Sequence, residues 1–294
     1  MLNVYKQITQ NKLKSTLVII FFIAFVSLIG YSLSYLFELG TGYFVFAIIF
    51  SLFSSFTSYF WGDKIVLKLN GANPASRQKY FNFYTVTENL SMANKTPMPR
   101  IYVINSPSMN AFATGRDPQH SVICATTGLL EKLNRTELEG VIGHELSHIK
   151  NYDIRLMMIV SMLIGTLSIL INMAYRTSMF GNKNDNKNGL SSIFAILGLI
   201  LIIFAPLIAQ LIQFAISRQR EFLADASSVK LTRQPQGLID ALTKITQDPN
   251  IMSTASTATA SLYISNPFKN NKLASLFSTH PPVQDRIRAL QQML

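Results

Sequence analysis

The sequence predicts an α+β, mainly helical, integral membrane protein with about four transmembrane helices and a separate soluble region. Three observations lead to this fold class. Long charge-free stretches alternate with stretches of soluble composition, and only 14% of the 294 residues are charged. Soluble domains typically have about 25% charged residues. The soluble stretches also combine short β-branched runs with longer segments of helical periodicity.

Four charge-free stretches account for the predicted membrane part, and each can supply the roughly 20 apolar residues that cross a bilayer. They lie between Lys14 and Glu38, Glu38 and Asp63, Arg155 and Arg176, and Lys187 and Arg218. The predicted organisation is an N-terminal transmembrane hairpin (1–62), a soluble region (63–155), a second transmembrane hairpin (156–217) and a C-terminal soluble region (218–294).

The first hairpin is expected to contain spans at 17–37 and 43–61. A cleaved signal peptide is the alternative for the first, but its apolar run is long and no small-residue cleavage site follows. The later spans are expected at 156–175 and 190–217, the last kinked at Pro206. The alternative for this second pair is a partly embedded hairpin beside the soluble region.

The distribution of positive charge predicts orientation rather than a nucleic-acid partner. The net charge is +11, but the basic residues are scattered and form no basic run with interleaved aromatics, so we expect no nucleic-acid partner. Lys6, Lys12 and Lys14 precede the first span, and only Glu38 follows it. This asymmetry places the N-terminus in the cytoplasm. The single cysteine, Cys124, excludes an intrachain disulfide framework.

Local patterns predict the elements of the soluble region. The segment 80–94 has helical periodicity, with Phe83, Val86, Leu90 and Ala93 as its buried stripe. Strands are expected at 101–104 and 121–126, because β-branched residues dominate these runs. Helices are expected over 217–230 and after the two prolines at 281–282. The segment 253–261, poor in packing residues, is expected to be a flexible lid or surface loop.

One pattern organises the soluble region: His144-Glu145-Leu146-Ser147-His148, an H-E-x-x-H sequence. On a helix, His144 and His148 lie one turn apart on one face, so both imidazoles can bind one zinc ion. Glu145 can then reach a water at the metal and take its proton, as hydrolysis requires. Two capping boxes, starting at Asn134 or Thr136, are possible beginnings for this helix.

A catalytic zinc ion needs a third protein ligand, and the residues leave its identity open. The extended pattern with a third histidine is excluded, because Asn151 and Ile154 occupy the required positions. The remaining histidines are His120 and His280, and His120, beside a predicted strand, is expected to be an ordinary loop histidine. Glu221 is the better candidate, with Asp225 one turn later on the same face to hydrogen-bond a ligand histidine. Equally, Glu221 could simply neutralise neighbouring arginines.

Several ordered motifs together resemble the HtpX-type membrane zinc metalloproteases and, more distantly, the CAAX prenyl proteases of the same gluzincin superfamily. The resemblance runs from end to end. Its motifs are Ser108-Met-Asn-Ala-Phe-Ala-Thr-Gly115, Gly143-His-Glu-Leu-Ser-His148, Arg220-Glu-Phe-Leu-Ala-Asp225, Leu262-Tyr-Ile-Ser-Asn-Pro267 and Ser278-Thr-His-Pro-Pro282.

The resemblance implies a zincin-like catalytic domain with one Zn²⁺ per subunit and assigns its residues. It implies ligands His144, His148 and Glu221, a general base and acid at Glu145, and an outer partner at Asp225. His280 would stabilise the oxyanion, and Asn110, Ala111, Phe112 and Ala113 would form the substrate-binding edge. Arg286 matches a family arginine, and its expected role is either a structural salt bridge or a catalytic contact.

The resemblance also implies where the protein acts and on what. We expect a multi-pass protein of the bacterial cell membrane, with its catalytic domain in the cytoplasm. Its partners would be the lipid bilayer and unfolded or membrane protein substrates, whose peptide bonds it hydrolyses in protein quality control. The alternatives are a CAAX-type protease that processes lipidated peptides and a catalytically silent membrane scaffold.

Overall fold

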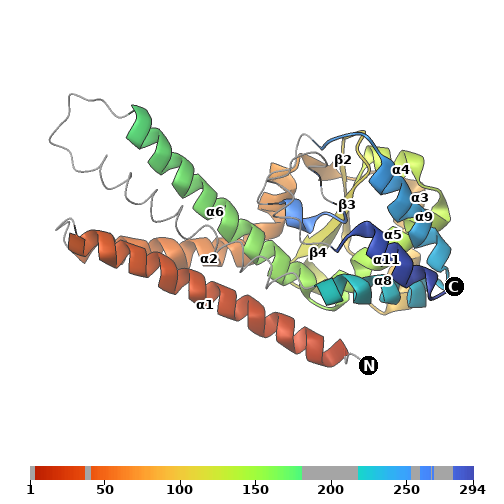
Figure 1. Ribbon diagram of the computed structural model, residues 1–294, viewed down its shortest axis with the longest axis horizontal. Coiled ribbons are helices and arrows are strands. Elements are labelled where there is room, and N and C mark those ends of the chain that lie inside the picture. The colour runs from red at the N-terminus through yellow and green to blue at the C-terminus, as the bar shows by residue number, and fades with distance from the viewer. Residues whose placement is uncertain (1–3, 37–40, 181–217, 253–258, 266, 268–280) are drawn as a thin grey trace.

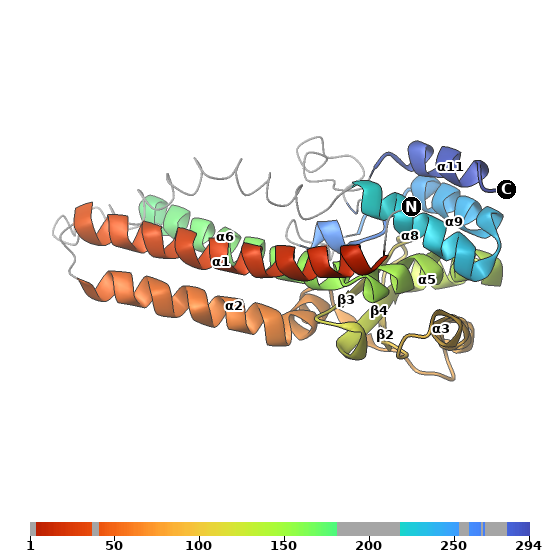
Figure 2. The same cartoon turned by 90° about the horizontal axis from the view of Figure 1, so that it is seen from below.

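Three long helices form an arm that projects from the part of the molecule that holds the β-sheet (Figure 1). The computed structural model describes residues 4–36, 41–180, 218–252, 259–265, 267 and 281–294. The arm consists of α1 (Val4–Leu36), α2 (Thr41–Leu69) and α6 (Asp153–Phe180). Both views place them side by side, with the start of α1 and the end of α2 at the end of the arm that is nearer the sheet (Figure 2).

Two helices of the described residues are long and apolar enough to cross a membrane, by length and composition. They are Ile8–Tyr31, with a mean hydropathy of 2.3, and Phe44–Leu69, with 1.6. Large apolar side chains on their surfaces are exposed, including Leu28, Phe46 and Phe53 at more than 60% each. Such a surface suits lipid better than water.

The first predicted span, 17–37, coincides with α1 as far as Leu36, and the second, 43–61, lies within α2. The third predicted span, 156–175, lies within α6. The fourth, 190–217, lies outside the described residues. The expectation of four transmembrane helices therefore stays a prediction.

A four-stranded sheet lies at the base of the arm. Its strands are β1 (Ala72–Pro74), β2 (Arg100–Ile104), β3 (Ala111–Gly115) and β4 (Ser121–Thr126), in the spatial order β1-β2-β4-β3. β2 and β4 run parallel, and the other two pairs are antiparallel. The predicted strands at 101–104 and 121–126 are confirmed. β3 lies at an edge of the sheet, which matters for the site described below.

The sheet separates two hydrophobic cores. The side chains of β4 show this directly, because they point alternately into one core and the other. Val122 and Cys124 pack on the side of the arm, whereas Ile123 and Ala125 pack on the side of the remaining helices. Successive side chains of a strand point to opposite faces, so a strand covered on both faces is apolar throughout. The arm is thus continuous with the folded core rather than connected through a loose linker.

The remaining helices pack on the other face of the sheet. They are α3 (Phe81–Asn94), α4 (Thr127–Lys132), α5 (Arg135–Lys150), α8 (Arg218–Thr232), α9 (Pro235–Gln247) and α11 (Val283–Gln291). Two 3₁₀ turns complete the described elements: η1 (Pro118–His120), which precedes β4, and η2 (Ala260–Leu262), whose Leu262 packs in the core on the side of the arm. The helices predicted over 80–94, over 217–230 and after the C-terminal prolines are confirmed.

Two details differ from the predictions. In α3, Phe83, Val86 and Leu90 are buried, but Ala93 is exposed. The buried stripe instead includes Thr87 and Ser91, which lie closer to its centre line than Ala93 does. In the predicted lid, residues 253–258 lie outside the described residues. Residues 259–261, at the start of η2, are buried. The prediction of a surface loop is therefore wrong for this part of the segment.

Candidate metal centre

The H-E-x-x-H sequence lies in α5, whose N-terminus is fixed by the first of the two predicted capping boxes. Asn134 Oδ1 accepts a hydrogen bond from the Glu137 amide over 3.0 Å, and the Glu137 carboxylate accepts one from the Asn134 amide over 2.8 Å. The apolar side chains Val141, Ile142, Leu146 and Ile149 of this helix are completely buried. The cap and these side chains hold α5 against the sheet, and the histidines are oriented accordingly.

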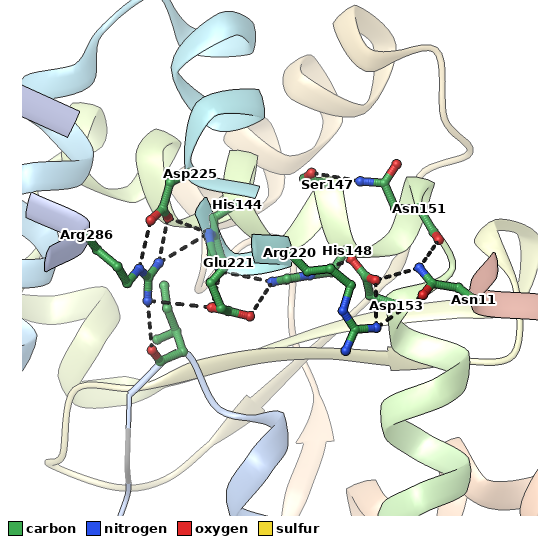
Figure 3. Close-up of polar contacts among 11 residues, drawn as sticks. Asn11, His144, Ser147, His148, Asn151, Asp153, Arg220, Glu221, Asp225 and Arg286 are labelled. Atoms are coloured by element: carbon green, nitrogen blue, oxygen red, sulfur yellow. Dashed lines mark hydrogen bonds and ion pairs between the residues drawn. The ribbon is translucent and has the colours of Figure 1, made fainter. Parts of the chain in front are cut away.

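Three buried side chains converge at this helix: His144, His148 and Glu221 (Figure 3). The two Nε2 atoms are 3.0 Å apart. The Glu221 carboxylate oxygens lie 3.7 Å from Nε2 of His144 and 3.6 Å from Nε2 of His148. A tetrahedral zinc ion with bonds of about 2.0–2.1 Å places its ligand atoms about 3.3 Å apart. The donor set therefore fits zinc in both spacing and chemistry.

Glu221 reaches this position because α8 packs very closely on α5. Ser228 of α8 donates a hydrogen bond from its hydroxyl to the Gly140 carbonyl over 2.7 Å. A Cβ atom at Gly143, the residue before His144, would lie only 2.7 Å from the Ser228 hydroxyl. The absence of a side chain at position 143 thus lets α8 bring its acidic residues to the histidines.

Asp225 and Arg286 hold the outer side of His144. An Asp225 oxygen lies 2.9 Å from Nδ1 of His144 and accepts a hydrogen bond from it, which leaves Nε2 directed at the cluster. Arg286 donates to both oxygens of Asp225, over 2.6 and 2.8 Å, and to the Ile264 carbonyl over 3.3 Å. Arg286 is completely buried. The arginine thus forms a salt bridge with Asp225, and its Nη1 also lies 3.8 Å from Glu221 Oε2.

Asp153 holds His148 in the same way, and sequence reasoning missed this residue. Its Oδ2 lies 3.0 Å from Nδ1 of His148. Tyr152, with φ of 62°, turns the chain sharply between α5 and α6, so the first residue of α6 points back at His148. A left-handed conformation is uncommon for a bulky residue and often marks a functional site. The only sign of this role in the sequence is that Asp153 is an acidic residue five positions after His148.

The surrounding charges give the two histidines opposite protonation behaviour. Burial, together with the positive charge of Arg286, lowers the pKa of His144 to about 4. Burial also lowers the pKa of His148, but its hydrogen bond to Asp153 and the charge of Glu221 outweigh this and raise it to about 9. A histidine must be neutral to bind a metal ion. A cation that binds here therefore takes the place of the proton on His148.

Glu145 lies next to this cluster on α5 and is 2% exposed. Its negative charge contributes to the raised pKa of both His148 and Arg286. Its carboxylate is thus close to His148, but it is not one of the three side chains whose ligand atoms converge. A proton acceptor beside a metal ion requires this arrangement, because it must reach the bound water without taking a coordination position.

The other two histidines of the chain are His280 and His120. His280 lies outside the described residues. The His120 side chain is 54% exposed and bonds the Asp117 carboxylate over 2.8 Å. Among the described residues, His120 is not in the group that could hold a metal ion. It behaves as the loop histidine that the sequence favoured.

The predicted substrate-binding edge, 110–113, forms the start of β3. Asn110 and Thr126 are bonded across β3 and β4, so the main-chain groups of Ala111 and Ala113 point away from β4. The Ala111 carbonyl accepts a hydrogen bond from the Ile264 amide over 2.9 Å, and the Asn110 side chain donates one to the Ser265 carbonyl over 2.9 Å. The Phe112 side chain is buried against Tyr263, with ring centroids 5.0 Å apart.

Comparisons with known proteins agree with this geometry. Residues 82–294 match the family described as peptidase family M48. A curated "Protease HtpX homolog" of Streptococcus thermophilus is 44% identical, covering 98% of this chain and 99% of that protein. One of Dictyoglomus turgidum is 43% identical, covering 98% and 94%. The crystal structure of S. mikatae Ste24p has a TM-score of 0.50 at 21% identity, over 97% of this chain and 66% of that one.

The family match covers well over half of the chain, and the curated relatives align with nearly all of it. The structural neighbour shows that the fold itself is shared. On these grounds the chain belongs to peptidase family M48 and is a membrane-bound metalloprotease of the HtpX type.

Proposed function

We propose that this metalloprotease is a zinc-dependent endopeptidase whose metal ligands are His144, His148 and Glu221. The observation that carries the proposal is the convergence of these three buried side chains, with ligand atoms within 4.8 Å of one another. The chemistry of two imidazoles and one carboxylate suits zinc. Zinc at this position supplies a Lewis acid that polarises the scissile carbonyl and acidifies water.

The remaining chemistry belongs to the protein's own side chains. Glu145 takes a proton from the attacking water and returns it to the leaving amine. Asp225 and Asp153 keep the outer nitrogens of the two histidines protonated, so that both Nε2 atoms stay directed at one point. His280 is the candidate for stabilising the oxyanion of the tetrahedral intermediate.

The outer edge of β3 is the proposed place for the substrate. An extended peptide would add to this edge as a strand, bonding main-chain groups at Ala113 beyond the position that Ile264 already occupies. Such recognition reads the backbone and few side chains, so it suits unfolded segments of many proteins. We therefore propose misfolded or membrane proteins as substrates.

We further propose a multi-pass protein of the bacterial cell membrane with its catalytic part in the cytoplasm. Lysines precede the first span, which favours a cytoplasmic N-terminus. The start of α1 and the end of α2 lie at the end of the arm where the sheet is (Figure 2). This is consistent with an N-terminus and a catalytic part in the same compartment.

The test is zinc stoichiometry in detergent-purified protein together with cleavage of an unfolded substrate such as casein. One zinc ion and cleavage are expected for the parent. Glu145→Gln should keep the zinc and lose turnover, and Glu221→Ala should lose both. Full zinc occupancy and activity in Glu221→Ala would place the third ligand elsewhere. A folded parent with neither zinc nor cleavage would favour a silent scaffold.

A further inference from the structure

The first membrane helix reaches the metal centre through one buried polar side chain, Asn11 of α1. Asn11 is 3% exposed, and Figure 3 shows it beside Asp153 and Arg220. Its Nδ2 donates to the Asn151 carbonyl over 2.9 Å and to Asp153 Oδ1 over 2.7 Å. Its Oδ1 accepts from Arg220 Nη1 over 3.2 Å. Two acceptors beside one end of the amide and a donor beside the other fix its orientation.

These bonds join α1 to both halves of the proposed ligand set. Asp153 uses its other oxygen to bond His148, and Arg220 immediately precedes Glu221 on α8. Arg220 Nη1 also bonds Asp153 Oδ1 over 3.2 Å, so the three side chains close a triangle. All three are at most 8% exposed, and hydrogen bonds are stronger in such surroundings than in water.

We propose that Asn11 is a positioning residue for the metal centre, which makes the first membrane helix part of that centre as well as an anchor. The amide holds Asp153 against His148 and holds Arg220 where Glu221 faces the histidines. Without it, Asp153 keeps one fewer donor and turns more freely, and the imidazole of His148 loses its fixed direction. The proposal rests on the ligand set proposed above.

An anchor alone would not need this arrangement. The neighbouring buried polar residue on the same helix, Ser15, bonds within its helix, from its hydroxyl to the Asn11 carbonyl over 2.8 Å. Asn11 instead bonds groups 140 to 209 positions further along the chain. Ser15 therefore provides a matched control: it is buried on α1, one turn away, and outside the metal centre.

The test uses the full chain in detergent and two readouts of the metal itself: zinc affinity by chelator competition and the d–d spectrum of the cobalt-substituted protein. Asn11→Ala is expected to weaken zinc binding about tenfold, at the lower end of the effect of outer partners of metal ligands, and to alter the cobalt spectrum. Asn11→Asp should weaken it at least as much, because it places an acceptor against Asp153. Ser15→Ala should match the parent.

A double-mutant cycle separates positioning from general destabilisation. If Asn11 acts through Asp153, Asn11→Ala should weaken zinc binding far less in an Asp153→Asn background than in the parent. Equal losses of zinc affinity in both backgrounds would overturn positioning through Asp153 and leave only the contact with Arg220. Parent-like affinity and spectrum in Asn11→Ala would overturn the whole proposal. If Ser15→Ala lost as much zinc affinity as Asn11→Ala, the effect would come from the packing of α1 and not from the amide of Asn11. A parent that binds no zinc would instead refute the ligand set, and this inference with it.

Discussion

The Ile264 amide donates a hydrogen bond to the Ala111 carbonyl over 2.9 Å, at the outer edge of β3. One position of the proposed substrate edge is therefore bonded within the chain. The next outward-facing main-chain groups belong to Ala113, because alternate residues of β3 face β4. The position of Ile264 thus sets where an added strand can begin.

This geometry predicts that Ala113→Pro impairs substrate binding and leaves the fold intact. Proline removes an N–H that faces away from β4, so the hydrogen bonds between β3 and β4 stay intact. The loss of one hydrogen bond should lower kcat/KM roughly two- to tenfold. Cleavage kinetics of an unfolded substrate provide the measurement.

Thr114→Pro is the matched comparison, since Thr114 pairs with Val122 and its amide faces β4. This variant should lose thermal stability, because proline there breaks the sheet itself. Parent-like kcat/KM in a folded Ala113→Pro variant would exclude strand addition at this edge.

The effects of mutating Asp225 and Arg286 on stability should depend on each other, whereas the effects on zinc affinity should not. Both are buried, and removal of one leaves the charge of the other uncompensated, at a cost of about 3–5 kcal/mol. The double variant Asp225→Asn/Arg286→Met should therefore be more stable than Arg286→Met alone. Melting temperatures in detergent test this.

Zinc affinity should instead depend on whether Asp225 is present, whatever residue stands at position 286. Asp225→Asn should weaken zinc binding about 10–100-fold, with or without Arg286→Met, because the charged partner of His144 is lost in both cases. If the double variant recovers parent affinity, Asp225 acts on stability alone, and its proposed role at His144 is wrong.

Local patterns were sufficient to predict many of the elements, though not β1 or α9, whereas long-range contacts could not be predicted. The helix that carries His144 and His148 has a capping box and an apolar face within a few residues, so its place could be predicted and its beginning narrowed to two positions. The strand at 121–126 could likewise be predicted. Asn11 and Asp153 are 142 positions apart, and nothing in either neighbourhood indicates that they meet. Ile264 was likewise invisible, because its contact with Ala111 uses only main-chain atoms.

Asp248 should stabilise the fold in a pH-dependent way. Burial raises the pKa of this carboxyl, but hydrogen bonds from Lys132, the Met109 amide and Asn250 outweigh burial and leave it below its usual value. A carboxyl with a lowered folded-state pKa contributes full stability above its unfolded-state pKa, here near 3.8, and loses it as the pH falls through the folded-state value.

Asp248→Asn should therefore lower the free energy of unfolding at pH 7 by about 1 kcal/mol, because a charge-assisted hydrogen bond becomes a neutral one. The variant should accordingly melt at a lower temperature than the parent. The difference should shrink as the pH falls below about 4. Asp285→Asn is the control, since this carboxylate pairs with Arg288 at an exposed site. A difference for Asp248→Asn that grows on acidification would contradict the argument.

Removal of the metal should destabilise the protein, because the proposed ligands join α5 to α8. A ligand that binds only the folded state adds about 4 kcal/mol of stability when its concentration is about 1,000 times its Kd. A zinc chelator should therefore lower the melting temperature of the zinc-loaded parent markedly. It should have no effect on Glu221→Ala, which is expected to lack the metal. His120→Ala should respond like the parent, because His120 is exposed and bonded to Asp117. A chelator response that disappears in His120→Ala would move the metal to the loop before β4.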